Sequence, residues 1–271
     1  MIMLKINKLR DEVKSNRPLI HAITNPISIH QCANTILAIG GRPIMAEHPK
    51  EVEEITGTSA ALLLNLGNIT DVRKESMRLS LRCAAEKKIP IILDVVGIAC
   101  STLRRQYVTE LLKIEVPTVI KGNYSEIRSL YDDCYRSSGV DADFSLNETD
   151  TDDICISLAR KLNTIVLASG KTDIVTDGRK IAHIRNGSEQ LTAITGTGCM
   201  LGALSAAYLS ADHTMDAITA ACVMMGICGQ LSETSIGYGS FMVNLMDFFS
   251  TISNESIANL IDMEENYLEE I

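Results

Sequence analysis

Short apolar runs alternate with amphipathic stretches along most of this chain, and this alternation constrains its fold more than any other feature. Each apolar run has the length of a buried strand, and the apolar residues that follow it have helical spacing. The runs cover residues 17–24, 42–46, 60–67, 90–97, 117–122 and 163–170. Since strands separated by helices pair in parallel, the pattern predicts an α/β fold with a mainly parallel central sheet and helices on both faces.

The pattern changes in the last third of the chain. Residues 172–178 and 180–187 alternate around Asp177-Gly178, which is typical of a β-hairpin. From Cys199 onward the spacing is helical almost to the end. Residues 132–150 are polar and irregular, which indicates a surface loop.

Composition narrows the class of protein. The net charge of −9 argues against nucleic acid as a partner, because an acidic surface repels phosphates. The longest strongly apolar stretch, Ala217–Gly229, is too short to span a bilayer, and the N-terminus lacks the apolar segment of a signal peptide, so we expect a cytoplasmic protein without a membrane partner.

The eight cysteines form no C-x-x-C pair and are expected to be free thiols. No Pro/Gly/Ser-rich linker divides the chain, which predicts one domain over residues 1–271.

Polar residues at the ends of the predicted strands are the first candidates for a site. In an open parallel sheet, ligands bind outside the carboxyl ends of the strands. The residues at or just after these ends are Asn25, Met45, Asn65, Asp94, Lys121 and Ser169.

The most informative segment is ITGTGCMLG, residues 194–202. Gly196 and Gly198 are expected to free the backbone at the start of a helix, where unpaired N–H groups can bind an anion. No Lys-Ser/Thr pair follows, and the glycine spacing differs from that of the dinucleotide fingerprint. A plain glycine turn before a core helix fits the same residues.

Two acidic residues each fit a structural and a functional interpretation. Asn123 and Glu126 have capping-box spacing, but Glu126 is also placed to hold a hydrated Mg²⁺ near a triphosphate, with Lys121 near the nucleotide. Asp94 ends an apolar strand, where a carboxylate is costly unless it is paired or solvated. It therefore fits either a ligand or metal contact or a helix cap.

Asn25 also has two interpretations. Beside Pro26 it fits either a contact to a small polar ring or a simple turn. The five histidines have neither zinc-protease nor triad spacing and are expected to be structural or surface residues.

Together these segments resemble hydroxyethylthiazole kinase, a thiamin-salvage family with the ribokinase-like fold. The resemblance runs from Pro18 to Phe249 with the motifs in the same order, and ITGTGCMLGAL is its most specific part. Most ribokinase-like kinases carry Asp where this sequence has Cys199, whereas Cys is a hallmark of the thiazole kinases. The resemblance implies that the hydroxyl of 4-methyl-5-(2-hydroxyethyl)thiazole is phosphorylated with ATP, and that the chain forms a homotrimer with sites at subunit interfaces.

The resemblance also implies roles on the acceptor side. Met45 and Gly196 resemble thiazole-binding positions, with Asn25 nearby. Cys199 takes the catalytic position, where we expect modest help as a weak base or hydroxyl acceptor. The helix start is expected to lower the pKa of Cys199, whereas bound triphosphate would act in the opposite direction.

On the nucleotide side, Lys121, Ser169 and Gly198 resemble ATP contacts. Asp94 and Glu126 resemble the carboxylates on the magnesium side. These assignments make Mg²⁺ the expected cofactor and ATP the co-substrate.

The sequence departs from the family pattern at a few positions. Val95 follows Asp94 where the family usually has Pro, and Ser169 replaces a common Thr but keeps the hydroxyl. The usual G-P-G-S-F turn is Gly237-Tyr-Gly-Ser-Phe241 here. These departures affect loop geometry rather than the expected chemistry.

Three other functions remain to be compared with thiazole phosphorylation. One is phosphorylation of a hydroxymethylpyrimidine or pyridoxal-like alcohol, and another is a nucleotide-dependent lyase that repairs hydrated nicotinamide cofactors. Cys199 disfavours both. A thiazole sensor without turnover is the third, and the retained Asp94, Lys121 and Glu126 disfavour it.

Overall fold

The strands form a single sheet. The computed structural model describes residues 2–137 and 148–269. Within them the strand order is β2-β1-β3-β4-β5-β6-β7-β8-β9. The strands are β1 (Leu19–Ile23), β2 (Arg42–Ile44), β3 (Ala61–Asn65), β4 (Ile91–Asp94), β5 (Val119–Asn123), β6 (Ile165–Ser169), β7 (Asp173–Thr176), β8 (Lys180–Ile184) and β9 (Met263–Tyr267). Pairing is parallel from β2 to β6 and antiparallel from β6 to β9, which confirms the predicted mainly parallel sheet.

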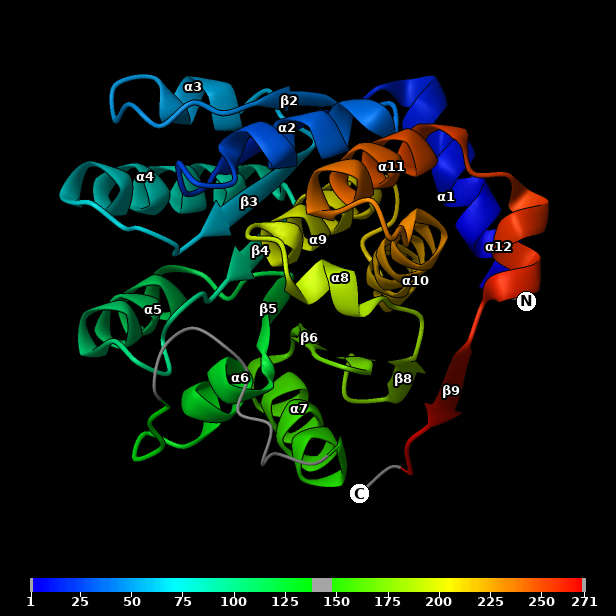
Figure 1. Cartoon of the computed structure of the whole chain (residues 1–271). Coiled ribbons are helices and arrows are strands. Elements are labelled where there is room, and N and C mark those ends of the chain that lie inside the picture. Colours follow the sequence, from blue (N-terminus) through cyan, green and yellow to red (C-terminus); the bar gives the residue numbers. More distant parts are fainter. Residues whose placement is uncertain (1, 138–147, 270–271) are drawn as a thin grey trace.

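Helices cover both faces of this sheet (Figure 1). The helices of one face are α1 (Ile2–Asn16), α2 (Ile29–Ala38), α9 (Thr197–Leu209), α10 (Met215–Ser232), α11 (Tyr238–Thr251) and α12 (Asn254–Leu260). Those of the other face are α3 (Val52–Thr56), α4 (Asp71–Lys87), α5 (Thr102–Ile114), α6 (Tyr124–Tyr131) and α7 (Glu148–Leu162). The short α8 (Glu189–Thr192) lies between β8 and α9. None of the helices in the described part of the chain has the length and apolar character needed to cross a membrane.

The side chains of β3 show how the sheet divides the core. Leu63 packs into the cluster under α9 and α10, whereas Leu62 and Leu64 pack into the cluster under α4 and α5. Successive side chains of a strand point to opposite faces, so a strand covered on both sides must be apolar throughout. This explains the uninterrupted run AALLLN, all of whose strand residues are buried.

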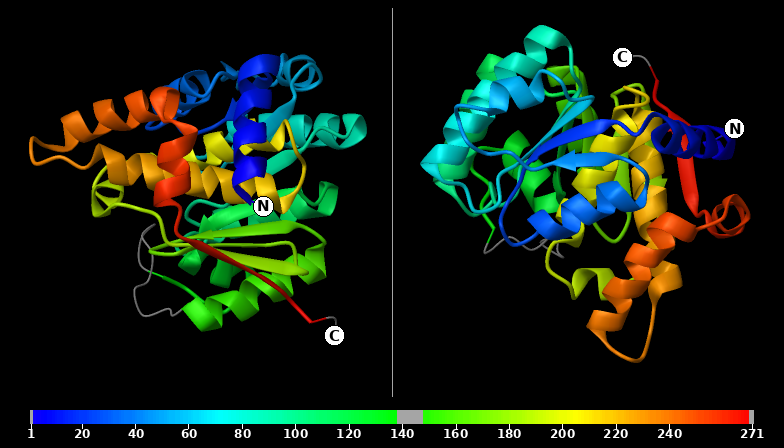
Figure 2. Two further views of the ribbon diagram at one scale, coloured as in Figure 1. Left: turned by 90° about the vertical axis from the view of Figure 1, so that its right-hand side faces the viewer. Right: turned by 90° about the horizontal axis from the view of Figure 1, so that it is seen from above.

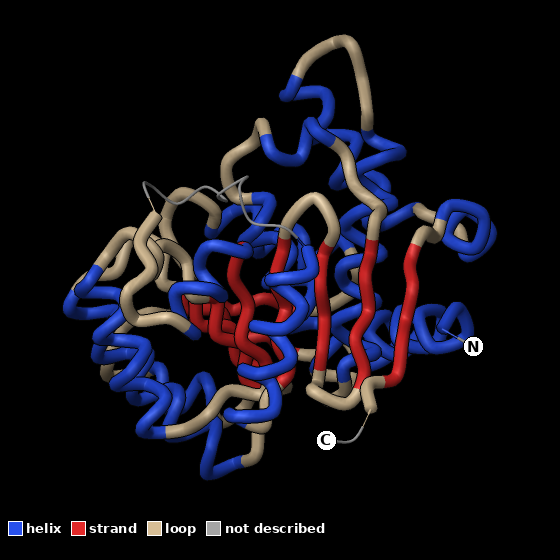
Figure 3. The backbone as a smooth tube through the Cα atoms, turned by 90° about the horizontal axis from the view of Figure 1, so that it is seen from below, coloured by secondary structure: helices blue, strands red, loops and turns tan. Residues whose placement is uncertain are grey.

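The predicted hairpin is present, and one strand beyond it was not predicted. β7 and β8 pair around Gly178, whose φ is +83°. β9 then adds to β8 at the edge of the sheet (Figures 2 and 3). Its sequence, MEENY, has too few apolar residues to indicate a strand, because an edge strand exposes most of its side chains. α1 and α8 were also not predicted.

Two sequence-based boundaries need correction. β5 continues to Asn123, so Lys121 lies inside the strand and pairs with Leu167 rather than lying at the strand end. The polar loop predicted at 132–150 is shorter, because α7 already begins at Glu148. Residues 138–147 of that loop lie outside the described residues.

Asn186, which follows β8, joins α10, α12 and the segment between α12 and β9. Its Nδ2 donates to Gln230 Oε1 at 2.9 Å and to the Leu260 carbonyl at 2.8 Å. Its Oδ1 accepts the N–H of Asp262 at 2.8 Å. α10 approaches this residue so closely that a Cβ on Gly226 would lie 2.3 Å from the Asn186 carbonyl oxygen.

We therefore expect Gly226→Ala to lower the free energy of unfolding by about 1–3 kcal/mol, since backbone cannot yield as a side chain can. Gly187→Ala is the matched control, because its Cβ would meet nothing within 4 Å. Its effect should stay within about 0.5 kcal/mol. Urea unfolding of both variants measures the difference, and equal stabilities would contradict the close approach of α10.

Candidate active site

The glycine-rich segment forms the start of α9. Gly196 is the N-cap residue with φ +98°, a conformation that favours glycine. The first intrahelical bond runs from the Met200 N–H to the Gly196 carbonyl at 2.9 Å, so the N–H groups of the first turn have no acceptor within the helix. Thr197 Oγ1 donates to the Leu191 carbonyl at 2.8 Å and fixes the turn. The predicted helix start is therefore present, and open N–H groups at such a start can bind an anion.

Gly198 lies in the first turn of α9, at the helix start where it was expected. Gly198 and Gly202 are four residues apart and share one helix face. A Cβ on Gly198 would lie 4.0 Å from Lys121 Nζ, and a Cβ on Gly202 would lie 3.5 Å from Asp94 Oδ2. This small-residue face lets α9 lie directly over the charged groups of β4 and β5.

Asp94 and Lys121 form a buried ion pair below that face. Lys121 Nζ donates to Asp94 Oδ2 at 3.1 Å, and Asn65 Nδ2 donates to the same oxygen at 2.9 Å. Burial raises the pKa of Asp94 against the opposing effects of Lys121 and Asn65. Burial acts to lower the pKa of Lys121, but Asp94, Cys199 and Glu126 outweigh it, and the pKa is raised. Lys121 therefore stays protonated.

One oxygen of this pair is left without a partner. Asp94 is only 1% exposed, and among the described residues its buried Oδ1 accepts no hydrogen bond. A buried carboxylate oxygen without a partner is costly, so it points to a cation, a water molecule or a substrate group at this place.

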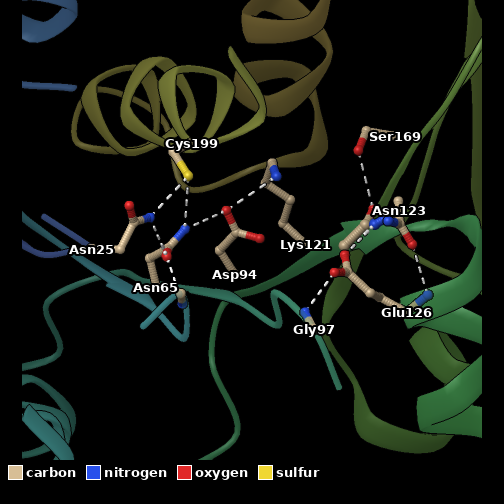
Figure 4. A network of polar contacts seen from close by, with 11 residues as sticks. Asn25, Asn65, Asp94, Gly97, Lys121, Asn123, Glu126, Ser169 and Cys199 are labelled. Carbon is tan, nitrogen blue, oxygen red and sulfur yellow. Dashed lines mark hydrogen bonds and ion pairs between the residues drawn. The ribbon is translucent and has the colours of Figure 1, made fainter. Parts of the chain in front are cut away.

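Glu126 has the predicted capping-box role. Its Oε2 accepts the Asn123 N–H at 2.7 Å, and Asn123 Oδ1 accepts the Glu126 N–H at 2.9 Å. Its Oε1 accepts the N–H of Gly97 at 2.6 Å, which ties the turn after β4 to α6 (Figure 4). Burial, followed by Asp94, raises the pKa of Glu126 to about 7 despite these backbone donors.

The thiol of Cys199 lies between two asparagine amides. Its Sγ accepts Asn25 Nδ2 at 3.3 Å and Asn65 Nδ2 at 3.4 Å (Figure 4). Asn25 also forms the turn that its sequence context allowed, because its Oδ1 accepts the N–H groups of Ile27 and Ser28 at 3.1 Å each. The pKa of Cys199 is raised, first by burial and then by Asp94, so the prediction that the helix start lowers it is wrong.

The remaining candidates lie at strand ends. Met45 directly follows β2 and packs against the core cluster under α9. The next residue, Ala46, is held through its carbonyl by His21 Nε2 at 2.9 Å. Ser169 ends β6 and donates to the Gly122 carbonyl at 3.3 Å. In Figure 4 Ser169 lies on the same side of the site as Glu126, and Asn25 lies on the opposite side, next to Cys199.

Two contacts within the candidate site were not predicted from the sequence. Asn65 was noted only as a strand-end residue, yet it contacts both Cys199 and Asp94. Gly97 supplies the second backbone donor to Glu126 with φ +77°. The strand-end position was a signal for Asn65, whereas a backbone N–H leaves no trace in the sequence.

Asp94 and Glu126 fit a metal ion only if phosphate oxygens and water supply its other ligands. Within the described residues no group of three or more His, Cys, Asp or Glu side chains is placed to hold a metal ion. Asp94 Oδ1 is available, whereas each Glu126 oxygen already accepts a backbone N–H. Hard cations such as Mg²⁺ keep several waters and bind through one or two carboxylates plus phosphates, which this pair fits.

Comparison with known proteins identifies the family. The family model described as "Hydroxyethylthiazole kinase family" matches residues 10–255. The chain belongs to the hydroxyethylthiazole kinase family. This membership confirms the resemblance drawn from the motif order and from Cys199.

Individual relatives agree with this assignment. Hydroxyethylthiazole kinase 2 of Clostridium botulinum is 44% identical over 259 residues, which cover 94% of this chain and 98% of the relative. The solved hydroxyethylthiazole kinase of Pyrococcus horikoshii has a TM-score of 0.89 and 32% identity over 97% of this chain and 99% of its own. A ribokinase-like superfamily protein of Enterococcus faecalis shares the fold, with a TM-score of 0.63 and 14% identity over 90% of this chain and 93% of its own. The predicted ribokinase-like fold is thereby confirmed.

The buried ion pair predicts a large, pH-dependent loss of stability in Lys121→Met. Removing one partner leaves Asp94 buried and uncompensated, which should cost about 3–5 kcal/mol at neutral pH. Because burial raises the pKa of Asp94, the folded state takes up its proton as pH falls, and the deficit should shrink under acid. Unfolding in urea at several pH values measures it.

Lys8→Met is the matched control, because the Lys8 side chain is 75% exposed and, within the described part of the chain, forms an ion pair with Glu12 alone, at 3.6 Å. Its effect should stay within about 0.5 kcal/mol. A Lys121→Met deficit that is equal at all pH values would show that Asp94 is not its cause.

Proposed function

We propose that this protein transfers the γ-phosphoryl group of ATP to the hydroxyl of 4-methyl-5-(2-hydroxyethyl)thiazole, giving the thiazole phosphate and ADP in thiamin salvage. The observation that carries the proposal is Cys199 in the first turn of α9, within a chain that matches the thiazole kinase family over residues 10–255. The family favours this alcohol over hydroxymethylpyrimidine or pyridoxal-like alcohols. A substrate panel separates these acceptors.

The negative charge of the transferred phosphoryl group would lie at the start of α9, near Lys121. Phosphoryl transfer depends on positioning and on neutralising charge rather than on covalent chemistry. The open N–H groups at the start of α9 and the ammonium of Lys121, 4.0 Å from a Cβ on Gly198, both favour negative charge there. Gly198 and Ser169 lie on the ATP side of the proposed site.

The acceptor side lies around Cys199. Asn25, Met45 and Gly196 are the proposed thiazole contacts, and the thiol faces the substrate hydroxyl. Because its pKa is raised, Cys199 is a poor base at neutral pH. A loose transition state needs little deprotonation of the alcohol before attack, which makes a poor base sufficient.

Mg²⁺ is the proposed cofactor. When bound, it would neutralise negative charge on the phosphates. Asp94 would hold it through Oδ1, and Glu126 would act through water, since both of its oxygens already accept N–H groups. The compartment proposed is the cytoplasm, which supplies ATP and suits eight free thiols. We further propose that the whole chain is one kinase domain, which a single sheet supports.

A homotrimer with sites at subunit interfaces is the proposed assembly. Apolar residues are exposed on α11 and the loop before it: Ile236 by 83%, Tyr238 by 57% and Val243 by 60%. Ile27, two residues from Asn25, is 55% exposed, and α2 packs against α11. A run of exposed apolar side chains beside the site supports a partner subunit there.

The reaction is tested by incubating the protein with ATP, Mg²⁺ and hydroxyethylthiazole and following phosphorus NMR. We expect a phosphate ester of the thiazole alcohol to form together with ADP. Asp94→Asn keeps the shape but loses charge at the phosphates, and should lower kcat by about 10²- to 10³-fold. Absence of the ester with folded wild-type protein would refute the proposal, and unchanged turnover in Asp94→Asn would refute the metal-side role.

Assembly is tested by sedimentation equilibrium at micromolar concentration. The wild-type chain should sediment as a trimer, and Val243→Asp should shift it toward monomer because a buried, unpaired carboxylate is costly. Val72→Asp is the control, since Val72 is 50% exposed at the start of α4 on the other face of the sheet. A monomeric wild-type protein would rule out the interfacial site.

A further inference from the structure

Asn65 lies at the centre of the polar network that joins Asn25, Cys199 and Asp94. It is the last residue of β3 and is fully buried. Its Nδ2 donates to Asp94 Oδ2 at 2.9 Å and to Cys199 Sγ at 3.4 Å. Its Oδ1 accepts Asn25 Nδ2 at 3.2 Å and the Gly67 N–H at 2.9 Å. One side chain therefore connects the thiol to the ion pair (Figure 4).

Backbone donors fix which way both amides point. The Gly67 N–H can only donate, so the atom of Asn65 that faces it must be the oxygen. The N–H groups of Ile27 and Ser28 fix Asn25 in the same way. With both oxygens engaged, the NH₂ groups of Asn25 and Asn65 must face the sulfur of Cys199. The sulfur is thus held as an acceptor from two sides.

We propose that Asn65 is a positioning residue that orients the Cys199 thiol toward the acceptor hydroxyl. Two amide donors occupy two lone pairs of Sγ, so the proton of the thiol, or the third lone pair of the thiolate, is directed away from Asn25 and Asn65. The same amide donates to Asp94, so the position of the thiol is fixed relative to the ion pair below α9. The kinetic part of this inference rests on the proposed thiazole kinase activity.

An amide is the side chain that meets both requirements at this position. A carboxylate in its place would put a second negative charge beside Asp94, and an apolar side chain would leave Asp94 Oδ2 and the Gly67 N–H short of a partner. Asn65 supplies donors to two acceptors and an acceptor to two donors while remaining neutral. This accounts for a fully buried Asn at the end of an apolar strand.

A double-mutant cycle tests whether Asn65 acts through Cys199. Loss of one hydrogen bond in a buried charged network should lower kcat of Asn65→Ala by about 10- to 100-fold with KM for the thiazole nearly unchanged. In the Cys199→Ala background, the same substitution should have an effect at least about threefold smaller, because coupled residues are not additive. Equal effects in both backgrounds would overturn the inference.

A second measurement needs neither substrate nor turnover. Iodoacetamide labelling of Cys199, followed by peptide mass spectrometry across pH, reports where the thiolate forms, and the exposed Cys100 serves as internal reference. Removing an amide donor should move the labelling midpoint of Cys199 upward in Asn65→Ala, while that of Cys100 stays in place. An unchanged Cys199 midpoint would overturn the inference.

Two further variants keep these outcomes interpretable. Asn266→Ala, on the exposed edge strand β9, should leave both readouts unchanged. If Asn65→Ala does not fold, Asn65→Ser retains a hydroxyl to accept the Gly67 N–H but lacks the amide donors, and should show the same two shifts. A labelling shift in a protein that makes no thiazole phosphate would refute the proposed function and support the positioning role.

Discussion

The close approach of α9 to a buried ion pair is the constraint on which the rest of the site depends. Gly198 and Gly202 bring the helix start over Lys121 and Asp94, with Gly202 Cα close enough that a Cβ would lie 3.5 Å from the Asp94 carboxylate. This approach fixes where the open N–H groups of the first turn point. It also brings Cys199 next to Asn25, which follows β1, and to Asn65 at the end of β3. A side chain longer than that of Ala at Gly198 or Gly202 would move the first turn of α9 away from the charges below it.

Such a cluster is retained despite its cost to stability. A buried ion pair rarely contributes net stability, because desolvation offsets much of the attraction between the charges. The cost is limited because nearly every group has a partner: Asn65 and Lys121 serve Asp94, and backbone N–H groups serve Glu126. Among the described residues Asp94 Oδ1 has no partner, and it is the atom that the proposed chemistry would use. A local cost in folding stability is typical of functional sites.

Several residues of the candidate site make more than one structural contact. Glu126 completes a capping box, and its carboxylate also helps to raise the pKa of Lys121 in the ion pair. Asn25 closes a turn with its oxygen and holds the thiol with its nitrogen. Val95, in place of the usual Pro, donates its N–H to the Lys121 carbonyl at 2.8 Å, a bond that Pro could not make. The departure is therefore accommodated without disturbing the strand pair.

The sequence by itself determined the α/β class, the parallel sheet, the hairpin at Gly178 and the family, because these depend on local periodicity and on a contiguous motif around Cys199. It also placed most site residues at strand ends, where topology brings them to one edge. It could not assign Asn65 or Gly97, and it misjudged the pKa of Cys199 and the strand position of Lys121. Those depend on burial and on neighbours from β3, β4 and β5, and only the tertiary structure brings these strands together under α9.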